Sequence, residues 1–415
     1  MYTLLRSLQF STICLLTILI ALSEPLQSNA ADPPLSAPLR TSCVRMSVFP
    51  TSEVCKSDPG RSFTYFVDQK EYLFDGYLIL GNSADNLSYS TEFGPSSGSP
   101  TASNPYGYLL PETPAMTIDS TTVSGYRVAS GKGYNRDSTI MFDVRWFASK
   151  HPDTCNTFIG EFKIYKGPNG GTVNGLTIAY YADWDVPSDS FNYNYSGADA
   201  ARSMVYQRGA FTNGPNNNGS RYGAMGGLSH KQSIVGGFTL SSAIYSYPEG
   251  GVFENDSIWN RMSILQNGQY SIAPGSADPG AGTGPAIELV SVLVLDRNQT
   301  VDSNDTLYYG VILAGQPEGG SLAGLKSAID KGSHFAQSHN LVPGAFYECN
   351  CGDCDGNGII TISDAVCLIS IIFSGQPFPT PYCNGDADGN CIITISDAVY
   401  LINYIFAGGP APHCC

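Results

Sequence analysis

The chain has 415 residues, of which only 14% are charged, and its formal net charge is −15. This negative charge argues against nucleic acids and anionic membrane surfaces as partners. The scarcity of charge, together with 45 glycines and many Ser, Asn, Thr and Tyr residues, excludes a helical bundle and favours a β-rich exoprotein with many turns.

The first thirty residues have the pattern of a secretory signal peptide. Arg6 precedes a short apolar run over residues 10–22, and residues 28–30 (Ser-Asn-Ala) form a small-residue cleavage site. The run is too short for a membrane-spanning helix, and no later apolar run is long enough to cross a bilayer. We therefore expect a secreted, extracellular or cell-surface protein that begins near Ala31 and has no membrane span.

Residues 31–42 and 43–345 differ in pattern. The first segment is rich in proline, which predicts an irregular leader. In the second, short runs of strand-forming residues alternate with Gly, Asn, Asp and Pro turn signals, and no helical crossovers separate the runs. This pattern predicts a mainly β, sandwich-like large domain.

Alternation within the runs predicts which side chains face the core. The residues expected to point inward are Ile140, Phe142, Val144, Trp146, Phe162, Ile164, Ile178 and Tyr180. The run 287–296 is apolar on both faces and indicates a central strand, with the run 307–315 as its neighbour. The segments 92–112 and 211–229 have little regular pattern and are expected to be loops, and the glycine-rich residues 222–228 and 235–238 are expected to be turns.

One helix is predicted before the C-terminal segment. Ser321 is a suitable N-cap, and the apolar residues Leu322, Leu325, Ile329 and Phe335 form a stripe at helical spacing. A short linker follows this helix.

The segment 182–190 contains the most distinctive polar motif of the large domain. Its candidate residues are Asp183, Trp184, Asp185 and Asp189. Four interpretations remain open: a metal site, a glycan site in which Trp184 stacks on a sugar, a pair of glycosidase carboxylates, or an Asp-rich turn with Trp184 in the core. No H-E-x-x-H motif is present, and no G-x-S-x-G match has the pattern of a strand–turn–helix nucleophile elbow, so no catalytic residue can be named.

Two copies of one short sequence, residues 352–376 and 385–409, end the chain. Each copy has side-chain oxygens at loop positions 1, 3 and 5, a backbone carbonyl at 7, a threonine at 9 and a carboxylate at 12, which is the spacing of a calcium loop. The predicted ligands of two calcium ions are Asp353, Asp355, Asn357, Ile359, Thr361 and Asp364, and Asp386, Asp388, Asn390, Ile392, Thr394 and Asp397.

An apolar helix is predicted after each loop but none before it, so each unit is half of an EF-hand. The duplicated loop–helix pattern resembles a type I dockerin, and residues 346–415 are expected to form a small α-helical domain of this kind. The resemblance implies calcium-dependent folding and docking onto a cohesin-like module or cell-surface scaffold. It also implies that loop positions 10 and 11, which are Ile362, Ser363, Ile395 and Ser396, contact the partner.

Two further expectations concern this small domain. Loop position 6 is Gly358 in the first copy but Cys391 in the second, and a Cβ in a turn with positive φ costs roughly 1 kcal/mol. Two alternatives remain open: the second site is weaker, or a disulfide holds this turn. One loop–helix unit cannot bury its apolar face alone. The predicted shared core consists of Val366, Ile369, Phe373, Val399, Ile402 and Phe406.

Twelve cysteines are present, of which Cys14 lies in the signal peptide and eight lie at or after Cys349. Secretion favours disulfide bonds, but the pairing does not follow from the sequence. The odd number that remains after cleavage predicts at least one free thiol or an intermolecular bond.

Two functional hypotheses follow. In the first, the large domain is a non-catalytic binding or surface-structural module that the C-terminal repeats tether. In the second, it is a glycoside hydrolase that degrades polysaccharide, because type I dockerins most often accompany such enzymes. The segment around Asp183 resembles stretches of uncharacterised secreted bacterial proteins that carry dockerins, which implies no particular activity.

Overall fold

A computed structural model describes the greater part of one compact unit, Leu35–Cys415. The described residues are 36–55, 62–89, 109–121, 125–135, 137–187, 193–209, 221–231, 234–241, 255–279, 287–345, 349–376, 378–379, 381–390 and 392–413. The predicted signal peptide and its predicted cleavage site, together with Asp189 and Cys391, lie outside these ranges.

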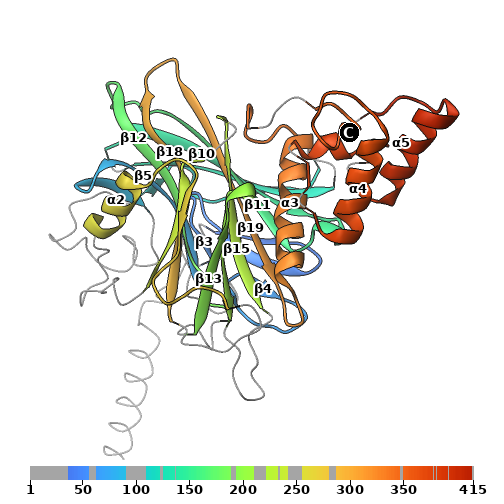
Figure 1. Ribbon diagram of the computed structural model, residues 1–415. Helices are drawn as coiled ribbons and strands as arrows, with labels where there is room; N and C mark the ends of the chain where they lie inside the picture. Colours follow the sequence, from blue (N-terminus) through green and yellow to red (C-terminus); the bar gives the residue numbers. More distant parts are fainter. Residues whose placement is uncertain are drawn as a thin grey trace, which may run out of the picture. The chain divides into compact units, whose positions relative to one another are not determined.

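Two large β-sheets pack face to face in the described part of the chain (Figure 1). The first has the order β1 (Ala37–Arg40), β2 (Val44–Val48), β3 (Val54–Cys55), β5 (Asp75–Ser83), β12 (Val173–Asp183), β18 (Leu289–Val301), β16 (Gly236–Ser241) and β17 (Gln269–Ser271), with β4 (Thr64–Tyr65) beside β2 and β6 (Asn86–Tyr89) beside β5. All its pairings are antiparallel except that of β16 with β17.

The second sheet is antiparallel throughout. Its order is β13 (Asn194–Asp199), β14 (Met204–Gly209), β15 (Tyr222–Ser229), β19 (Thr306–Gln316), β11 (Thr157–Lys166), β10 (Ile140–Ser149), β9 (Tyr126–Tyr134) and β7 (Leu110–Pro111), with β8 (Thr117–Asp119) beside β9. The predicted mainly β class with a few helices is therefore confirmed.

The core between the sheets follows the alternation of the strands. In β10, Ile140, Phe142, Val144 and Trp146 are at most 3% exposed, whereas Arg145 between them is exposed. Successive side chains of a strand point to opposite faces, so one face of β10 packs in the core. The inward residues predicted on β11 and β12 are also buried.

A helix covers the outer face of each sheet. On the first sheet, α2 (Asn255–Ile264) packs through Ile258 and Met262. On the second, α3 (Leu322–Ser338) lies against β11 and β19, and Leu325 and Ile329 are buried there (Figure 1). The side chain of Ser321 caps α3 as predicted, whereas α2 was not predicted because its apolar stripe is short.

The prediction of an irregular leader up to residue 42 is wrong for Ala37–Arg40, which form β1 and pair with β2. Ala37 and Leu39 are buried on one face of this strand. Pro38 is tolerated because β1 lies at the edge of its sheet, where a missing N–H leaves no neighbouring strand without a donor.

The predicted pairing of residues 287–296 with 307–315 is also wrong. These runs contribute to β18 and β19, which are central strands of different sheets. Both are apolar on both faces because each sheet is covered by the other sheet on one side and by a helix on the other. Such a pattern predicts a central strand but does not identify its partner.

The glycine-rich residues expected to form turns belong instead to strands β15 and β16. A Cβ added to Gly223 in β15 would lie 2.2 Å from Cε3 of Trp184, and one added to Gly227 would lie 2.7 Å from Cδ1 of Ile234. These glycines therefore provide space for large side chains to pack against the strand.

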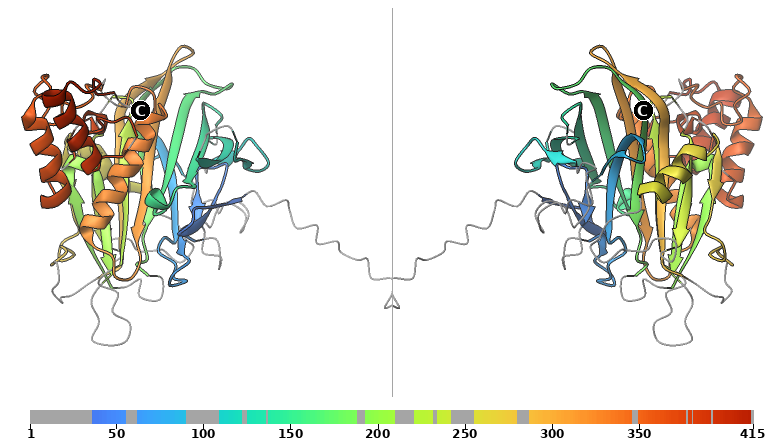
Figure 2. Two further views of the ribbon diagram at one scale, coloured as in Figure 1. Left: turned by 90° about the vertical axis from the view of Figure 1, so that its right-hand side faces the viewer. Right: turned by 90° about the vertical axis from the view of Figure 1, so that its left-hand side faces the viewer.

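The C-terminal repeats form two similar helices, α4 (Ile362–Ser374) and α5 (Ile395–Ala407), which pack against each other (Figures 1 and 2). A short 3₁₀ turn, η4 (Tyr382–Gly385), precedes the second loop. Each helix ends at a glycine with positive φ, Gly375 or Gly408, which is a common helix terminus. In the described residues from 349 onward, no helix enters the first loop.

The predicted core of these repeats is wrong. The helices pack through smaller or alternate apolar residues, namely Ala365, Leu368, Ile371, Ala398 and Leu401. By contrast, Phe373 and Phe406 are 72% and 70% exposed. Each helix is apolar on more than one side, so helical periodicity does not show which side is covered.

Three disulfide bonds connect described cysteines: Cys43–Cys155, Cys349–Cys383 and Cys354–Cys367. The first joins the beginning of the β-domain to the segment between β10 and β11. Cys55 is a buried free thiol. Among the helices described here, none is both long and apolar enough to cross a membrane.

Candidate functional site

The first C-terminal loop brings three carboxylates together. Oxygens of Asp353, Asp355 and Asp364 all lie within 4.8 Å of one another. Asp364 is fully buried at the start of α4, where its Oδ1 accepts a hydrogen bond from the Asp355 N–H (3.1 Å) and its Oδ2 from the Thr361 N–H (2.7 Å). Asp364 therefore connects the loop to the helix that follows it.

Asp353 is only 3% exposed, and its two carboxylate oxygens differ in their hydrogen-bond partners. Its Oδ2 accepts hydrogen bonds from the Gly358 N–H (2.9 Å) and from Nδ2 of Asn350 (3.0 Å). Its Oδ1 is buried and has no hydrogen-bond partner. A buried carboxylate oxygen without a donor is unfavourable, and a bound cation would satisfy it.

The remaining side chains of the first loop shape its backbone. Oδ1 of Asp355 accepts from the Asn357 N–H at 3.1 Å, and Oδ1 of Asn357 accepts from the Ile359 N–H at 2.8 Å. Gly358 has φ of +84°, in agreement with the expected glycine turn at position 6. The loop thus curves around its carboxylates.

The second loop repeats this arrangement. Oxygens of Asp386, Asp388 and Asp397 lie within 4.8 Å of one another. Oδ1 of Asp397 accepts from the Ala387 N–H (2.8 Å), and Oδ1 of Asp388 accepts from the Asn390 N–H (3.1 Å). Burial is the main cause that raises the pKa of Asp397 to about 6. The effect of Cys391 on this loop remains a prediction.

The threonines at position 9 have an additional structural role. Thr361 is the N-cap of α4, and its hydroxyl accepts from the Ser363 N–H; Thr394 does the same for α5 with Ser396. Asp364 and Asp397 complete the capping boxes. Contributions of these hydroxyls, and of the Ile359 and Ile392 carbonyls, to a metal site remain predictions.

The donor set fits a hard divalent cation. Each triad offers carboxylate oxygens, and the neighbouring Asn357 or Asn390 adds an amide oxygen. Oxygen ligands of this kind suit calcium, which accepts six to eight of them in flexible geometry, better than soft metals that prefer sulfur.

The exposed sides of α4 and α5 form a second feature of the repeats. Each helix presents four apolar side chains that are between 38% and 72% exposed: Ile362, Val366, Ile369 and Phe373 on α4, and Ile395, Val399, Ile402 and Phe406 on α5. We call these sets the apolar rows. The adjacent Ser363 and Ser396 are also exposed. Exposed apolar side chains in such rows are a candidate interaction surface.

Of the four interpretations of the motif around Asp183, the one in which Trp184 stacks on a sugar does not fit the structure. Trp184 has no exposed surface and packs edge-on against Phe63, with ring centroids 5.7 Å apart, so no face of its indole is open to a ligand. Asp183 and Asp185 are buried as well, and neither belongs to a metal-competent group of the described residues. Burial, followed by Glu288 and Glu71, raises the pKa of Asp185 to about 7.

No protein-family model and no curated protein matches this chain. Among solved structures, a bacterial glucoamylase complexed with acarbose aligns with a TM-score of 0.34 and 9% identity over 79% of this chain and 38% of that one. The GH36 α-galactosidase AgaA from Geobacillus stearothermophilus aligns with a TM-score of 0.31 and 7% identity over 70% of this chain and 42% of that one. This chain thus spans less than half the length of either enzyme, and likeness with TM-scores this low supports neither a shared fold nor a shared activity.

Proposed function

We propose that the C-terminal repeats bind two calcium ions and that they tether a secreted, non-catalytic β-domain to a partner. The observation that supports this most directly is the buried Oδ1 of Asp353, which has no hydrogen-bond donor and lies within a group of three carboxylates. The same spacing recurs in the second loop, in the pattern of a type I dockerin.

Electrostatics explain why the ions would stabilise the repeats. Each loop holds three carboxylates at short distance, and no Lys or Arg occurs after Lys331 to offset their repulsion. Bound calcium would supply that positive charge. In the first loop Asp353, Asp355, Asn357 and Asp364 would hold the ion, and the second loop would use the matching residues.

The apolar rows provide the proposed docking surface. Equivalent residues of the two helices have nearly equal exposure, for example 47% for Ile362 and 46% for Ile395. A cohesin-like partner could therefore bind either row, in two orientations related by the repeat. The rows contain no charged residue, so we expect docking to depend little on salt concentration.

The role of the β-domain in this proposal is to bind a ligand or to serve as a surface-structural unit. Polysaccharide remains a proposed ligand, and secretion through residues 1–30 remains part of the proposal. The alternative of a polysaccharide-degrading enzyme receives no support from a specific observation in the described residues.

Isothermal titration of the mature chain with calcium, after removal of metal, tests the proposal. We expect two binding events, one of which is lost in Asp353→Asn and the other in Asp388→Asn. The exposed Asp137→Asn serves as the matched control and should retain both. Absence of calcium binding to the wild-type chain, or unchanged binding in both loop variants, would contradict it.

A further inference from the structure

A disulfide bond crosses the first calcium loop. It joins Cys354 to Cys367 in α4, 13 positions further along the chain. Cys354 occupies loop position 2, between Asp353 and Asp355, and is only 4% exposed within the core of the repeats. The bond therefore closes a ring of chain that contains every predicted ligand of the first loop except Asp353.

Asp353 is held by a different disulfide and by hydrogen bonds. The Cys349–Cys383 bond ties the chain before the first loop to η4, which precedes the second loop. Next to it, the Asn350 N–H donates to Oδ1 of Asn384 at 2.8 Å, and Nδ2 of Asn350 donates to Oδ2 of Asp353 at 3.0 Å. Because the Cys349–Cys383 bond joins the entries of both loops, it does not distinguish one loop from the other.

The second loop has no counterpart of the Cys354–Cys367 bond. The matching positions of the second copy are Ala387 and Tyr400, which cannot form a disulfide. In other respects the described parts of the two loops agree: each has a group of three carboxylates, a threonine N-cap, a capping box and a helix that ends at a glycine. The cross-link is therefore the main covalent difference between the described parts of the two sites.

A cross-link of this kind changes the entropy that is lost when an ion binds. Without calcium, the carboxylates of each loop repel one another, and an unrestrained loop reduces this repulsion by opening. The disulfide removes most open conformations of the first loop before the ion arrives, so less conformational freedom is lost on binding. For a ring of about 15 residues, this effect corresponds to roughly tenfold to a hundredfold in an equilibrium constant.

We propose that the Cys354–Cys367 disulfide preforms the first calcium site, so that this site binds its ion more tightly than the second site and fills first. The two cysteines are positioning residues, because they contact no ion and act through the ligands that the ring contains. This inference rests on the proposed calcium binding and adds an order to it. At calcium concentrations between the two dissociation constants, the repeats carry one ion, in the first loop.

Calorimetric titration with calcium measures each loop separately in the mature full-length chain. Asp388→Asn removes the second site, so this variant reports the affinity of the first loop, and Asp353→Asn reports that of the second loop in the same way. We expect the first loop to bind calcium at least about fivefold more tightly than the second. A smaller ratio, or tighter binding by the second loop, overturns the proposal.

Removal of the bond tests its role directly. In the Asp388→Asn chain, Cys354→Ala combined with Cys367→Ala should lower the calcium affinity of the first loop about tenfold to a hundredfold. In the Asp353→Asn chain, the same pair should change the affinity of the second loop by less than about twofold, because the bond does not span that loop. A merely structural role of the bond would lower both affinities together.

The reverse exchange gives a gain of affinity rather than a loss. Ala387→Cys combined with Tyr400→Cys, in the Asp353→Asn chain, places cysteines at the matching positions of the second loop. Once mass spectrometry of the unreduced chain shows the new bond, the calcium affinity of the second loop should rise about tenfold or more. This arm keeps the proposal testable if the alanine pair fails to fold, and an unchanged affinity of the bonded second loop overturns it.

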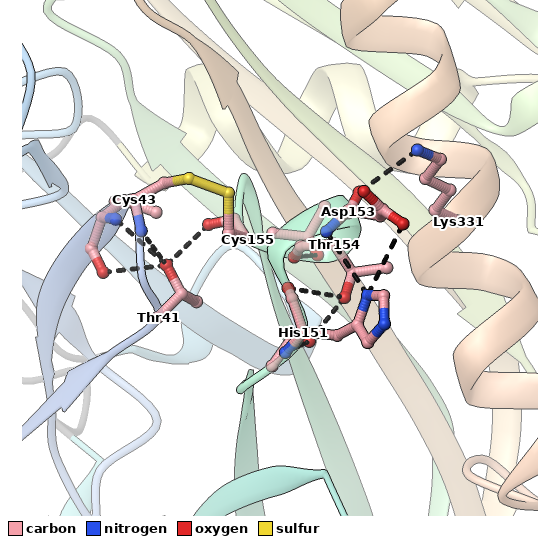
Figure 3. Close-up of a disulfide and its surroundings, with 10 residues drawn as sticks. Thr41, Cys43, His151, Asp153, Thr154, Cys155 and Lys331 are labelled. Atoms are coloured by element: carbon pink, nitrogen blue, oxygen red, sulfur yellow. Dashed lines mark hydrogen bonds and ion pairs between the residues drawn. A yellow bond between two sulfur atoms is a disulfide. The ribbon is translucent and has the colours of Figure 1, made fainter.

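The matched control breaks a disulfide outside the repeats. Cys43→Ala combined with Cys155→Ala removes the bond between the beginning of the β-domain and the residue after the 3₁₀ turn η1 (Pro152–Thr154). Figure 3 shows this bond, with the hydroxyl of Thr41 donating to the Cys155 carbonyl at 2.6 Å. Neither cysteine belongs to a calcium loop, so both calcium affinities should stay within about twofold of their starting values. The thermal midpoint checks the folding of each variant.

The outcomes separate this inference from the proposed function. A wild-type chain that binds no calcium contradicts both. Two bound ions whose affinities do not depend on the Cys354–Cys367 bond, or an equal loss of affinity in both loops, leave the proposed function intact and overturn this inference alone.

Discussion

Asp353 and Asp364 are both buried carboxylates of the first loop, yet their surroundings differ. Both oxygens of Asp364 accept backbone N–H groups, including one at the start of α4. One oxygen of Asp353 has no such donor. Asp364 is thus part of the helix cap whether or not an ion is bound, whereas Asp353 has an oxygen available for the ion.

We therefore predict different effects of two substitutions. Asp353→Asn should lower the calcium affinity of the first loop at least tenfold and leave the stability of the calcium-free chain unchanged or raised, because it removes a repulsive charge. Asp364→Ala should also destabilise the calcium-free chain, by about 1 kcal/mol, because the capping box is lost. Calorimetric unfolding with calcium and with chelator measures both effects, and equal destabilisation by the two variants in chelator would argue against this distinction.

Asp185 gives a prediction about pH. Its pKa of about 7 in the folded chain exceeds the value near 4 of an unfolded aspartate, so the folded state binds a proton more tightly. The raised pKa of Asp185 therefore lowers the free energy of unfolding as pH rises from about 4 to about 7, by an amount on the order of a few kcal/mol.

The variant Asp185→Asn should accordingly be more stable than the wild type at pH 8 and of equal stability at pH 4. Thermal unfolding across this range, with Asp137→Asn as the exposed control, measures the difference. A difference between variant and wild type that stays constant with pH would show that Asp185 is not the titrating group.

At the scale of elements, α4 and α5 each have a covered side and an exposed side. Leu368→Ala should destabilise the repeats by about 2–5 kcal/mol, because Leu368 is fully buried between the helices. Phe373→Ser should change stability by about 0.5 kcal/mol or less, because Phe373 is 72% exposed. Thermal unfolding of the two variants in calcium measures these changes in stability. Equal destabilisation by the two variants would show that the apolar rows are covered in solution.

The elements also show what the sequence could predict. Strict alternation predicted the inward face of β10, and a cap followed by a stripe predicted α3, because each has one buried face. The ligand spacing of the loops predicted which carboxylates converge. The packed sides of α4 and α5, the separation of β18 from β19, and the glycine-rich strand β15 depend on which surface covers each element, and no local pattern contains that information.

At the scale of the whole molecule, the positions of β18 and β19 in the sheets determine when the β-domain can fold during its synthesis. Each is a central strand of its sheet, β18 between β12 and β16, and β19 between β15 and β11. Both come late in the β-domain, within Leu289–Val301 and Thr306–Gln316. A growing chain that ends before Thr306 leaves β11 and β15 with open edges, which are surfaces for pairing with other chains. Partial synthesis products of this protein are therefore expected to aggregate, and the sandwich can close only after most of the polypeptide has left the ribosome.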